Sequence, residues 1–236
     1  MGGVLEGRIA LVTGASRGIG RAVALRFAQE GAHIIAVART TGGLEELDDE
    51  IKASGNEGAT LVPMDLTDFD AIDHLGAALY DRFGKLDVLV GNAGILGKLT
   101  PMHQTDAEVW KKTMDINLTA NWRLLRSMDP LLRTSDAGRA IFVSSTVGHD
   151  VRAFWSAYAV SKAALEMMVK IYAAENEKTP IRANLINPGA TRTAMRAEAY
   201  PGENPDTLKT PDDVTDLFLE LASPACTRNG DLLEPT

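Results

Sequence analysis

Short apolar runs alternate with amphipathic segments along most of this chain, and this alternation constrains the fold more than any other feature. Runs of four to six apolar residues are typical of strands that are buried on both faces of a sheet. Each run is followed by a stretch in which apolar residues recur with helical spacing. The predicted strands are Arg8–Thr13, His33–Ala38, Thr60–Pro63, Leu86–Val90, Arg139–Val143 and Ile181–Ile186.

The segments between these runs are predicted helices. Strands that alternate with helices form parallel pairs with crossover helices, so the sheet is expected to be parallel and covered on both faces. The chain of 236 residues suits a single α/β domain, residues 1–236. A last strand is expected at Asp231–Glu234. The predicted helices are Gly18–Glu30, Leu44–Ser54, Phe69–Phe83, Asp106–Leu132 and Ala153–Ala174.

The composition argues against several classes of protein. The formal net charge of −8 disfavours non-specific binding to nucleic acid. No apolar run is long enough to span a bilayer, and Met1–Glu6 lacks the basic and apolar regions of a secretory signal. The single cysteine, Cys226, permits no internal disulfide, so a cytoplasmic location is expected. The four histidines are scattered without metal-ligand spacing, so no metal site is expected.

A glycine-rich segment directly after the first predicted strand indicates a nucleotide site. Glycines there let the backbone turn tightly and approach a pyrophosphate, and the following helix points its N-terminal amides at the anion. The spacing is GxxxGxG rather than GxGxxG, and a tight turn that needs glycine only for geometry is the alternative. Its position in the first strand–helix unit favours the nucleotide site. The candidate residues are Gly14, Ser16, Arg17, Gly18, Ile19 and Gly20.

Lys162 stands four positions after Tyr158 in a predicted helix, so the two residues share one face of it. An ammonium near a phenol favours the phenolate, and we therefore expect Lys162 to lower the pKa of Tyr158 towards the range of a general acid or base. An ordinary exposed helix pair is the alternative. Ser144 and Ser145 follow the fifth predicted strand, where hydroxyls face the ligand crevice of a parallel sheet or cap a turn.

The end of the second predicted strand indicates which dinucleotide binds. A carboxylate at this point accepts hydrogen bonds from the ribose 2′-hydroxyl of NAD. Here Arg39 stands in that place, no acid follows before Glu45, and Arg17 adds a second cation in the glycine segment. Guanidinium groups bind a 2′-phosphate through charge-assisted hydrogen bonds. The sequence therefore predicts NADP(H) as the preferred cofactor, with NAD(H) possible. Ordinary solvated arginines are the alternative.

Taken together, the motifs resemble the short-chain dehydrogenase/reductase family, and within it 3-oxoacyl-(acyl-carrier-protein) reductase-like members. The resemblance runs from about Gly7 to Met195. It implies a single Rossmann-like domain with a doubly wound parallel sheet of about seven strands. It also implies hydride transfer between NADP(H) and a small-molecule ketone or secondary alcohol. The motifs are Thr13–Gly20, Gly91–Gly94, Asn117, Ser145, Tyr158 with Lys162, and Pro188–Gly189.

The same resemblance assigns roles to individual residues. Tyr158 corresponds to the family's proton donor or acceptor, Lys162 to the lysine that also holds the nicotinamide ribose, and Ser145 to the serine that orients the carbonyl. Asn117 corresponds to the asparagine that holds a water of the proton relay. The remaining cofactor contacts are Asp65 and Leu66 at the adenine, Asn92, Ala93 and Gly94 beside the adenosine ribose, and Pro188, Gly189, Thr191 and Thr193 at the carboxamide.

Three expectations concern regions outside these motifs. The polar segment Arg196–Lys209 follows the sixth predicted strand and is expected to be a loop that covers the substrate. The long predicted helices Asp106–Leu132 and Ala153–Ala174 are the surfaces that pair in the family, so a homodimer or homotetramer is expected. The segment from Asn229 to Glu234 differs from the C-terminal tail of many family members. The expectation of a tetramer, whose interface would use that tail, is therefore weaker than that of a dimer. A nucleotide sensor or scaffold that has the fold but no turnover is the alternative function.

Overall fold

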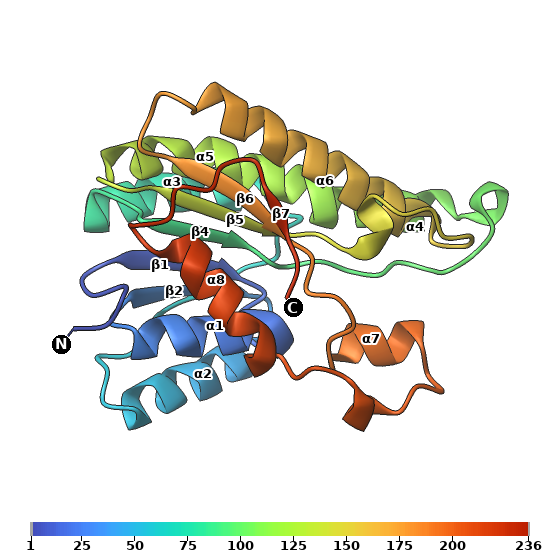
Figure 1. The fold of residues 1–236 in the computed structure, drawn as a ribbon, viewed down its shortest axis with the longest axis horizontal. Coiled ribbons are helices and arrows are strands. Elements are labelled where there is room, and N and C mark those ends of the chain that lie inside the picture. The colour runs from blue at the N-terminus through green and yellow to red at the C-terminus, as the bar shows by residue number, and fades with distance from the viewer. Residues whose placement is uncertain (1, 236) are drawn as a thin grey trace.

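The computed structural model describes residues 2–235 and contains a seven-stranded sheet in which every neighbouring pair is parallel. The strand order is β3-β2-β1-β4-β5-β6-β7, so the chain winds outward from β1 in both directions (Figure 1). The prediction of a doubly wound parallel sheet is confirmed. The strands are β1 Ile9–Thr13, β2 His33–Ala38, β3 Thr60–Pro63, β4 Val88–Gly91, β5 Arg139–Val143, β6 Arg182–Ile186 and β7 Leu232–Leu233.

Helices cover both faces of the sheet. In Figure 1, α1, α2 and α8 lie below the sheet, and α3, α5 and α6 lie above it. Neighbouring strand residues point to opposite faces, so Val12 packs with the helices of the lower layer and Leu11 with those of the upper layer. These covering helices are α1 Gly18–Gln29, α2 Thr41–Ala53 and α8 Thr215–Ala222 on one face, and α3 Phe69–Phe83, α5 Ala120–Thr134 and α6 Ser156–Glu175 on the other.

The long helix predicted over Asp106–Leu132 is interrupted. The chain forms α4 (Ala107–Met114), one π-helical segment (Asp115–Thr119) and then α5. Asp106 caps the start of α4 by accepting hydrogen bonds from the backbone amides of Glu108 and Val109. A π segment adds one residue to a helical turn and is often found at functional sites, and here it contains Asn117.

The C-terminal part contains a strand, β7, that the sequence predicts and a helix, α8, that it does not. α8 is only eight residues long, which is too short for its apolar residues to show a clear helical period. β7 pairs with β6 through Leu185–Leu232 and Ile186–Leu233, as expected for the seventh strand. Short 3-10 turns occur at Met102–Gln104, Thr146–Gly148, Pro205–Thr207 and Asp212–Val214.

The segment Arg196–Lys209 is more structured than the predicted loop. It starts within α7 (Ala194–Ala199), which lies beyond the carboxyl edge of the sheet (Figure 1). Arg196 forms two hydrogen bonds of 2.6 Å with the carboxylate of Glu203, and the Arg152 guanidinium donates to the Tyr200 hydroxyl. Charged and aromatic contacts therefore hold this segment where apolar anchors are few.

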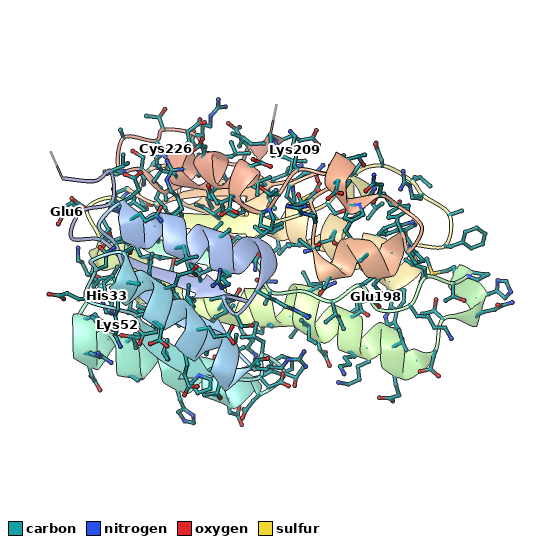
Figure 2. The ribbon with its side chains drawn as sticks, turned by 90° about the horizontal axis from the view of Figure 1, so that it is seen from below. Glu6, His33, Lys52, Glu198, Lys209 and Cys226 are labelled. Carbon is teal, nitrogen blue, oxygen red and sulfur yellow. The ribbon has the colours of Figure 1, made fainter. Side chains whose placement is uncertain are left out.

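The structure also locates the single cysteine and bears on membrane and metal sites. Cys226 is a free, half-buried thiol, and in Figure 2 it lies toward the end of the molecule away from Glu198 on α7. Within residues 2–235, no helix is long and apolar enough to cross a membrane, and no group of three or more His, Cys, Asp or Glu side chains is arranged to hold a metal ion.

Candidate active site

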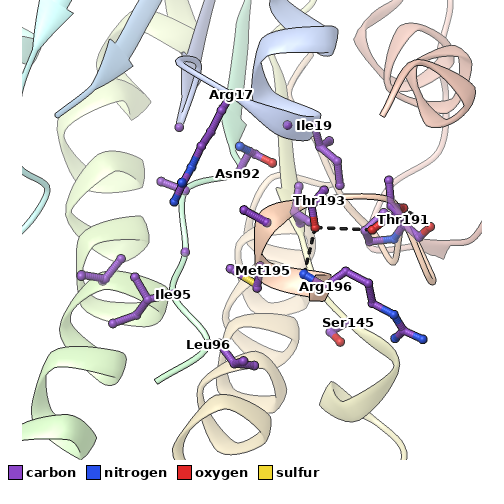
Figure 3. A pocket seen from close by; sticks show the side chains of 18 of the residues that line it. Arg17, Ile19, Asn92, Ile95, Leu96, Ser145, Thr191, Thr193, Met195 and Arg196 are labelled. Carbon is purple, nitrogen blue, oxygen red and sulfur yellow. Dashed lines mark hydrogen bonds between the residues drawn. The ribbon is translucent and has the colours of Figure 1, made fainter. Parts of the chain in front are cut away.

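A cleft of about 810 Å³ opens at the carboxyl edge of the sheet. The loops that follow β1, β2, β3, β4, β5 and β6 all contribute to its walls, because the carboxyl ends of parallel strands meet at one edge. Figure 3 shows labelled side chains from the segments after β1, β4, β5 and β6 and from α7 around this cleft. The cleft brings together all but two of the residues predicted for catalysis or cofactor binding, and the two exceptions are Gly20 and Asn117.

The turn between β1 and α1 has the geometry of an anion site. Gly14 and Gly18 have φ values of 67° and 57°, a region that favours glycine. A Cβ atom on Gly20 would lie 2.4 Å from Asn92 Nδ2, and this amide donates to the carbonyl of Thr13. Arg17 precedes α1 without making a side-chain cap, and the first turn contains no acid. The N-terminal amides of α1 are therefore suited to the pyrophosphate of a dinucleotide.

At the end of β2, Arg39 lies beside Asp65, an acid that follows β3 and is distant in the sequence. Arg39 Nη1 is 4.0 Å from Asp65 Oδ2, and both side chains are about half exposed. Asp65 accepts hydrogen bonds from the amide and hydroxyl of Thr67, which hold the pKa of its carboxyl below the ordinary value. No acid is close to Arg39 in the sequence, but Asp65 is close to it in the folded structure. The pair is long and solvated, so Arg39 can turn toward a phosphate.

Tyr158 lies near the start of α6 with its phenol facing the cleft, and only 8% of its surface is exposed. A hydrogen bond from Ser145 favours the phenolate, but burial has the larger effect and raises the pKa of Tyr158 above its ordinary value. The expectation that Lys162 lowers this pKa is therefore not met in this structure. Lys162 Nζ lies 5.7 Å from the centre of the phenol ring, and desolvation outweighs it.

Lys162 is even more deeply buried, with 4% of its surface exposed. Its ammonium donates a hydrogen bond of 2.7 Å to the carbonyl of Val143 at the end of β5. Burial lowers the pKa of Lys162 to about 8, and the negative charge of Glu166 acts in the opposite direction. The ammonium is therefore held at the cleft wall beside Tyr158. Its pKa of about 8 lies close to neutral pH.

Asn117 connects the loop after β4 to α6. Its Oδ1 accepts from the amide of Ile95 at 2.9 Å, and its Nδ2 donates to the Ile95 carbonyl and to Ser161 Oγ. Its own carbonyl accepts from Asn121 Nδ2 at 2.8 Å. The side chain is fully buried, so Asn117 lies behind the cleft wall rather than on it. Its direct contacts fix the loop after β4 against the helix that carries Tyr158 and Lys162.

The loop between β6 and α7 forms the opposite wall. Gly189 donates its amide to Asn187 Oδ1, and Thr191 is buried and donates to the Pro188 carbonyl. Thr193 caps α7 by accepting from the amide of Arg196, and its hydroxyl donates to the Thr191 carbonyl at 3.4 Å (Figure 3). The hydroxyl predicted to bind a carboxamide is thus already part of this local network.

Glu166 is the residue of this region that the sequence analysis missed. It lies one helical turn beyond Lys162 on α6, where the same four-residue spacing that linked Tyr158 to Lys162 would have found it. Ser144 Oγ donates to Glu166 Oε1 at 2.5 Å, and His149 Nδ1 lies 3.0 Å from the same oxygen. Ser144 therefore contacts a buried carboxylate instead of capping a turn.

Comparison with known proteins agrees with this geometry. The family model described as short chain dehydrogenase matches residues 8–204. The oxidoreductase YciK of Escherichia coli K12 is 40% identical over 220 residues, which are 92% of this chain and 87% of YciK. An NAD-dependent oxidoreductase of Mycobacterium tuberculosis is 34% identical over 251 residues, covering 94% of this chain and 91% of that protein.

Solved structures give the same result. A short chain dehydrogenase from Shigella flexneri 2a, crystallised in complex with NADP, superimposes with a TM-score of 0.96 at 38% identity. The superposition covers 100% of this chain and 99% of that chain. The resemblance found in the sequence is thereby confirmed for the family, and the narrower likeness to 3-oxoacyl-(acyl-carrier-protein) reductases stays a prediction. This chain belongs to the short-chain dehydrogenase family and is an oxidoreductase of that family.

Proposed function

We propose that this oxidoreductase transfers a hydride between NADP(H) and a ketone or secondary alcohol, with the proton exchanged at Tyr158. One observation carries the proposal. Tyr158, Ser145 and Lys162 line the same cleft as the glycine turn and the N-terminus of α1. A proton donor, a hydroxyl and a buried cation thus lie beside a site shaped for a dinucleotide, as carbonyl reduction requires.

The chemistry follows from the state of each side chain. When bound, the reduced cofactor supplies the hydride that attacks the carbonyl carbon. The buried phenol of Tyr158 keeps its proton at neutral pH and donates it to the oxygen that becomes the alcohol. Ser145 donates a hydrogen bond at the phenol oxygen, and the Lys162 ammonium stabilises the negative charge that develops there. Asn117 positions the loop beside this group.

The cofactor assignment depends on charge. Arg17 and Arg39 both line the cleft, and Arg39 has only a long, solvated contact with Asp65. These guanidinium groups suit a 2′-phosphate, and the Shigella neighbour was crystallised with NADP. The Mycobacterium relative is described as NAD-dependent, so NAD(H) remains a possible second cofactor for this chain. The cofactor proposal is accordingly NADP(H) as the preferred dinucleotide.

The cleft wall next to Tyr158 is apolar. Leu96, Trp155 and Met195 line it, and the same residues pack around Tyr158 in a small hydrophobic cluster. Apolar walls favour substrates whose carbonyl carries hydrocarbon substituents. We propose that Arg196–Lys209 covers this side of the cleft, since Arg196 lines it and its segment contacts Arg152 of the opposite loop.

Oxidation of NADPH in the presence of a panel of ketones and aldehydes tests the proposal. We expect turnover with apolar ketones, measured as loss of NADPH absorbance and matched by the alcohol formed. Tight binding of NADPH without turnover on any member of a broad panel would instead favour the alternative, a nucleotide sensor or scaffold.

A dimer is also expected in solution. Trp122 on α5 and Val160, Met167 and Ile171 on α6 are large exposed apolar side chains, and the three on α6 share one face of the helix. Light scattering at micromolar concentration is expected to give the mass of a dimer or of a tetramer. The Met167→Glu variant is expected to shift the mass toward the monomer, while Tyr80→Glu, also exposed but on α3, leaves it unchanged. A monomeric wild type would contradict the proposal.

A further inference from the structure

Glu166 is a buried carboxylate to which the proposed hydride transfer gives no role. It lies on α6 with 5% of its surface exposed. Burying a carboxylate is unfavourable unless hydrogen bonds and a counter-charge compensate. Its Oε1 accepts from Ser144 Oγ at 2.5 Å and lies 3.0 Å from His149 Nδ1. These two contacts place it directly behind the end of β5, which carries Ser145.

The backbone around this carboxylate is closely fitted to it. A Cβ atom on Gly148 would lie 2.5 Å from Glu166 Oε1 and 3.0 Å from Ser144 Oγ. Glycine at this position lets the turn after Ser145 pack against the carboxylate. The Ser144 hydroxyl lies beside both, so the residue next to Ser145 is hydrogen-bonded to the buried carboxylate.

The second neighbour of Glu166 is the ammonium of Lys162. The two residues are separated by one turn of α6 and share one face of the helix. Lys162 has 4% of its surface exposed, and its hydrogen bond to the Val143 carbonyl brings no negative charge. Burial lowers the pKa of Lys162 to about 8, and the charge of Glu166 is the effect that opposes this. A buried carboxylate one helical turn away favours the ammonium, because little water screens the two charges.

We infer that Glu166 is a positioning residue for the reaction: its charge keeps the buried Lys162 protonated, and its hydrogen bond to Ser144 holds the strand end that carries Ser145. This inference rests on the proposed function, which gives Lys162 and Ser145 their roles. Glu166 itself does not line the cleft. It acts through Lys162 and Ser144. One variant can remove its charge and another can remove its hydrogen bond, so the two effects can be measured separately.

Other titratable groups lie close to Glu166 and Lys162, and the experiment needs a control for their charge. His149 lies between Glu166 and Glu234 of the C-terminal segment, with His149 Nε2 at 3.8 Å from Glu234 Oε1. Tyr158 faces Lys162 from the preceding turn of α6. A His149→Gln background removes the imidazole, so a change that persists there belongs to Glu166 and not to the charge state of His149.

The direct test is the titration of Lys162 by nuclear magnetic resonance in protein labelled at lysine Cε. The Lys162 signal is the one that is missing in Lys162→Met. In Glu166→Gln we expect this signal to titrate at lower pH than in wild type, because the ammonium has lost its nearby negative charge. Glu166→Asp keeps the charge and should titrate close to wild type. Glu175→Gln, an exposed change at the end of the same helix, should have no effect.

Kinetics provide the second measurement, with NADPH and a ketone that the panel identifies. The alkaline limb of the rate profile of Glu166→Gln should move to lower pH, so its turnover relative to wild type falls by roughly tenfold between pH 7 and pH 9. Ser144→Ala keeps the charge and removes the hydrogen bond, so its loss should be the same at every pH. Circular dichroism confirms that each variant is folded.

The possible results separate the inference from the proposed function. An unchanged Lys162 titration in folded Glu166→Gln overturns the inference, whatever substrate is found. A shifted titration together with no turnover on any carbonyl compound supports the charge role of Glu166 and counts against the proposed reaction. Because the titration needs neither cofactor nor substrate, the two outcomes cannot be confused.

Discussion

Replacing Tyr158 by phenylalanine is expected to lower turnover by about 100-fold or more while NADPH still binds. The phenyl ring fills the same space against Trp155, whose ring centre lies 5.8 Å from that of Tyr158. What is lost is the hydroxyl that accepts the hydrogen bond of Ser145 and gives its proton to the substrate oxygen. The measurement is the single-turnover rate, with NADPH affinity determined in parallel by fluorescence.

Tyr172→Phe is the matched control. Tyr172 lies on the same helix, and its hydroxyl donates to Asp129 at 2.8 Å, away from the cleft. This variant loses a partly buried hydrogen bond, which costs about 1 kcal/mol of stability, but it should keep its turnover per folded molecule. If Tyr158→Phe and Tyr172→Phe were equally active, Tyr158 would not be the proton donor.

The pH dependence of the wild type should reflect the burial of this group. Burial raises the pKa of Tyr158, so the phenol stays protonated through neutral pH and can act as an acid in the reduction direction. The spacing of Tyr158 and Lys162 predicts the opposite direction, because it accounts for the nearby ammonium and carries no information about burial. Four-residue spacing predicts which side chains are neighbours, whereas desolvation depends on the packing of distant segments.

The same distinction explains what could be predicted about the fold. The strands could be predicted because parallel strands between two helix layers are mostly apolar, and β2, β3 and β5 have the predicted bounds. The π segment at Asp115–Thr119 was not recognised, because one extra residue in a turn hardly changes the helical pattern. Nor did the sequence reveal that Asp65 lies beside Arg39, since this contact joins the ends of two separate strands.

Reversing the charge at the end of β2 is expected to reverse the cofactor preference. In Arg39→Asp, the affinity for NADPH should fall by roughly 10- to 100-fold, as for the loss of hydrogen bonds to a charged group. A carboxylate there would repel the 2′-phosphate, and with Asp65 nearby two negative charges would face it. The affinity for NADH should be unchanged or higher, because a carboxylate can accept hydrogen bonds from both ribose hydroxyls.

The measurement is the dissociation constant of each dinucleotide by calorimetry, at two salt concentrations. In the wild type, NADPH is expected to bind more tightly than NADH, and salt should weaken NADPH binding more strongly because the guanidinium–phosphate contact is partly screened. Arg82→Asp, an exposed change of the same charge in the last turn of α3, controls for net charge and should preserve the preference. Tighter binding of NADH by the wild type, or an equal loss in both arginine variants, would show that Arg39 does not select the cofactor. Such a result would leave the role of Tyr158 untouched, since Arg39 lies at the end of β2 and Tyr158 lies on α6, at separate parts of the cleft wall.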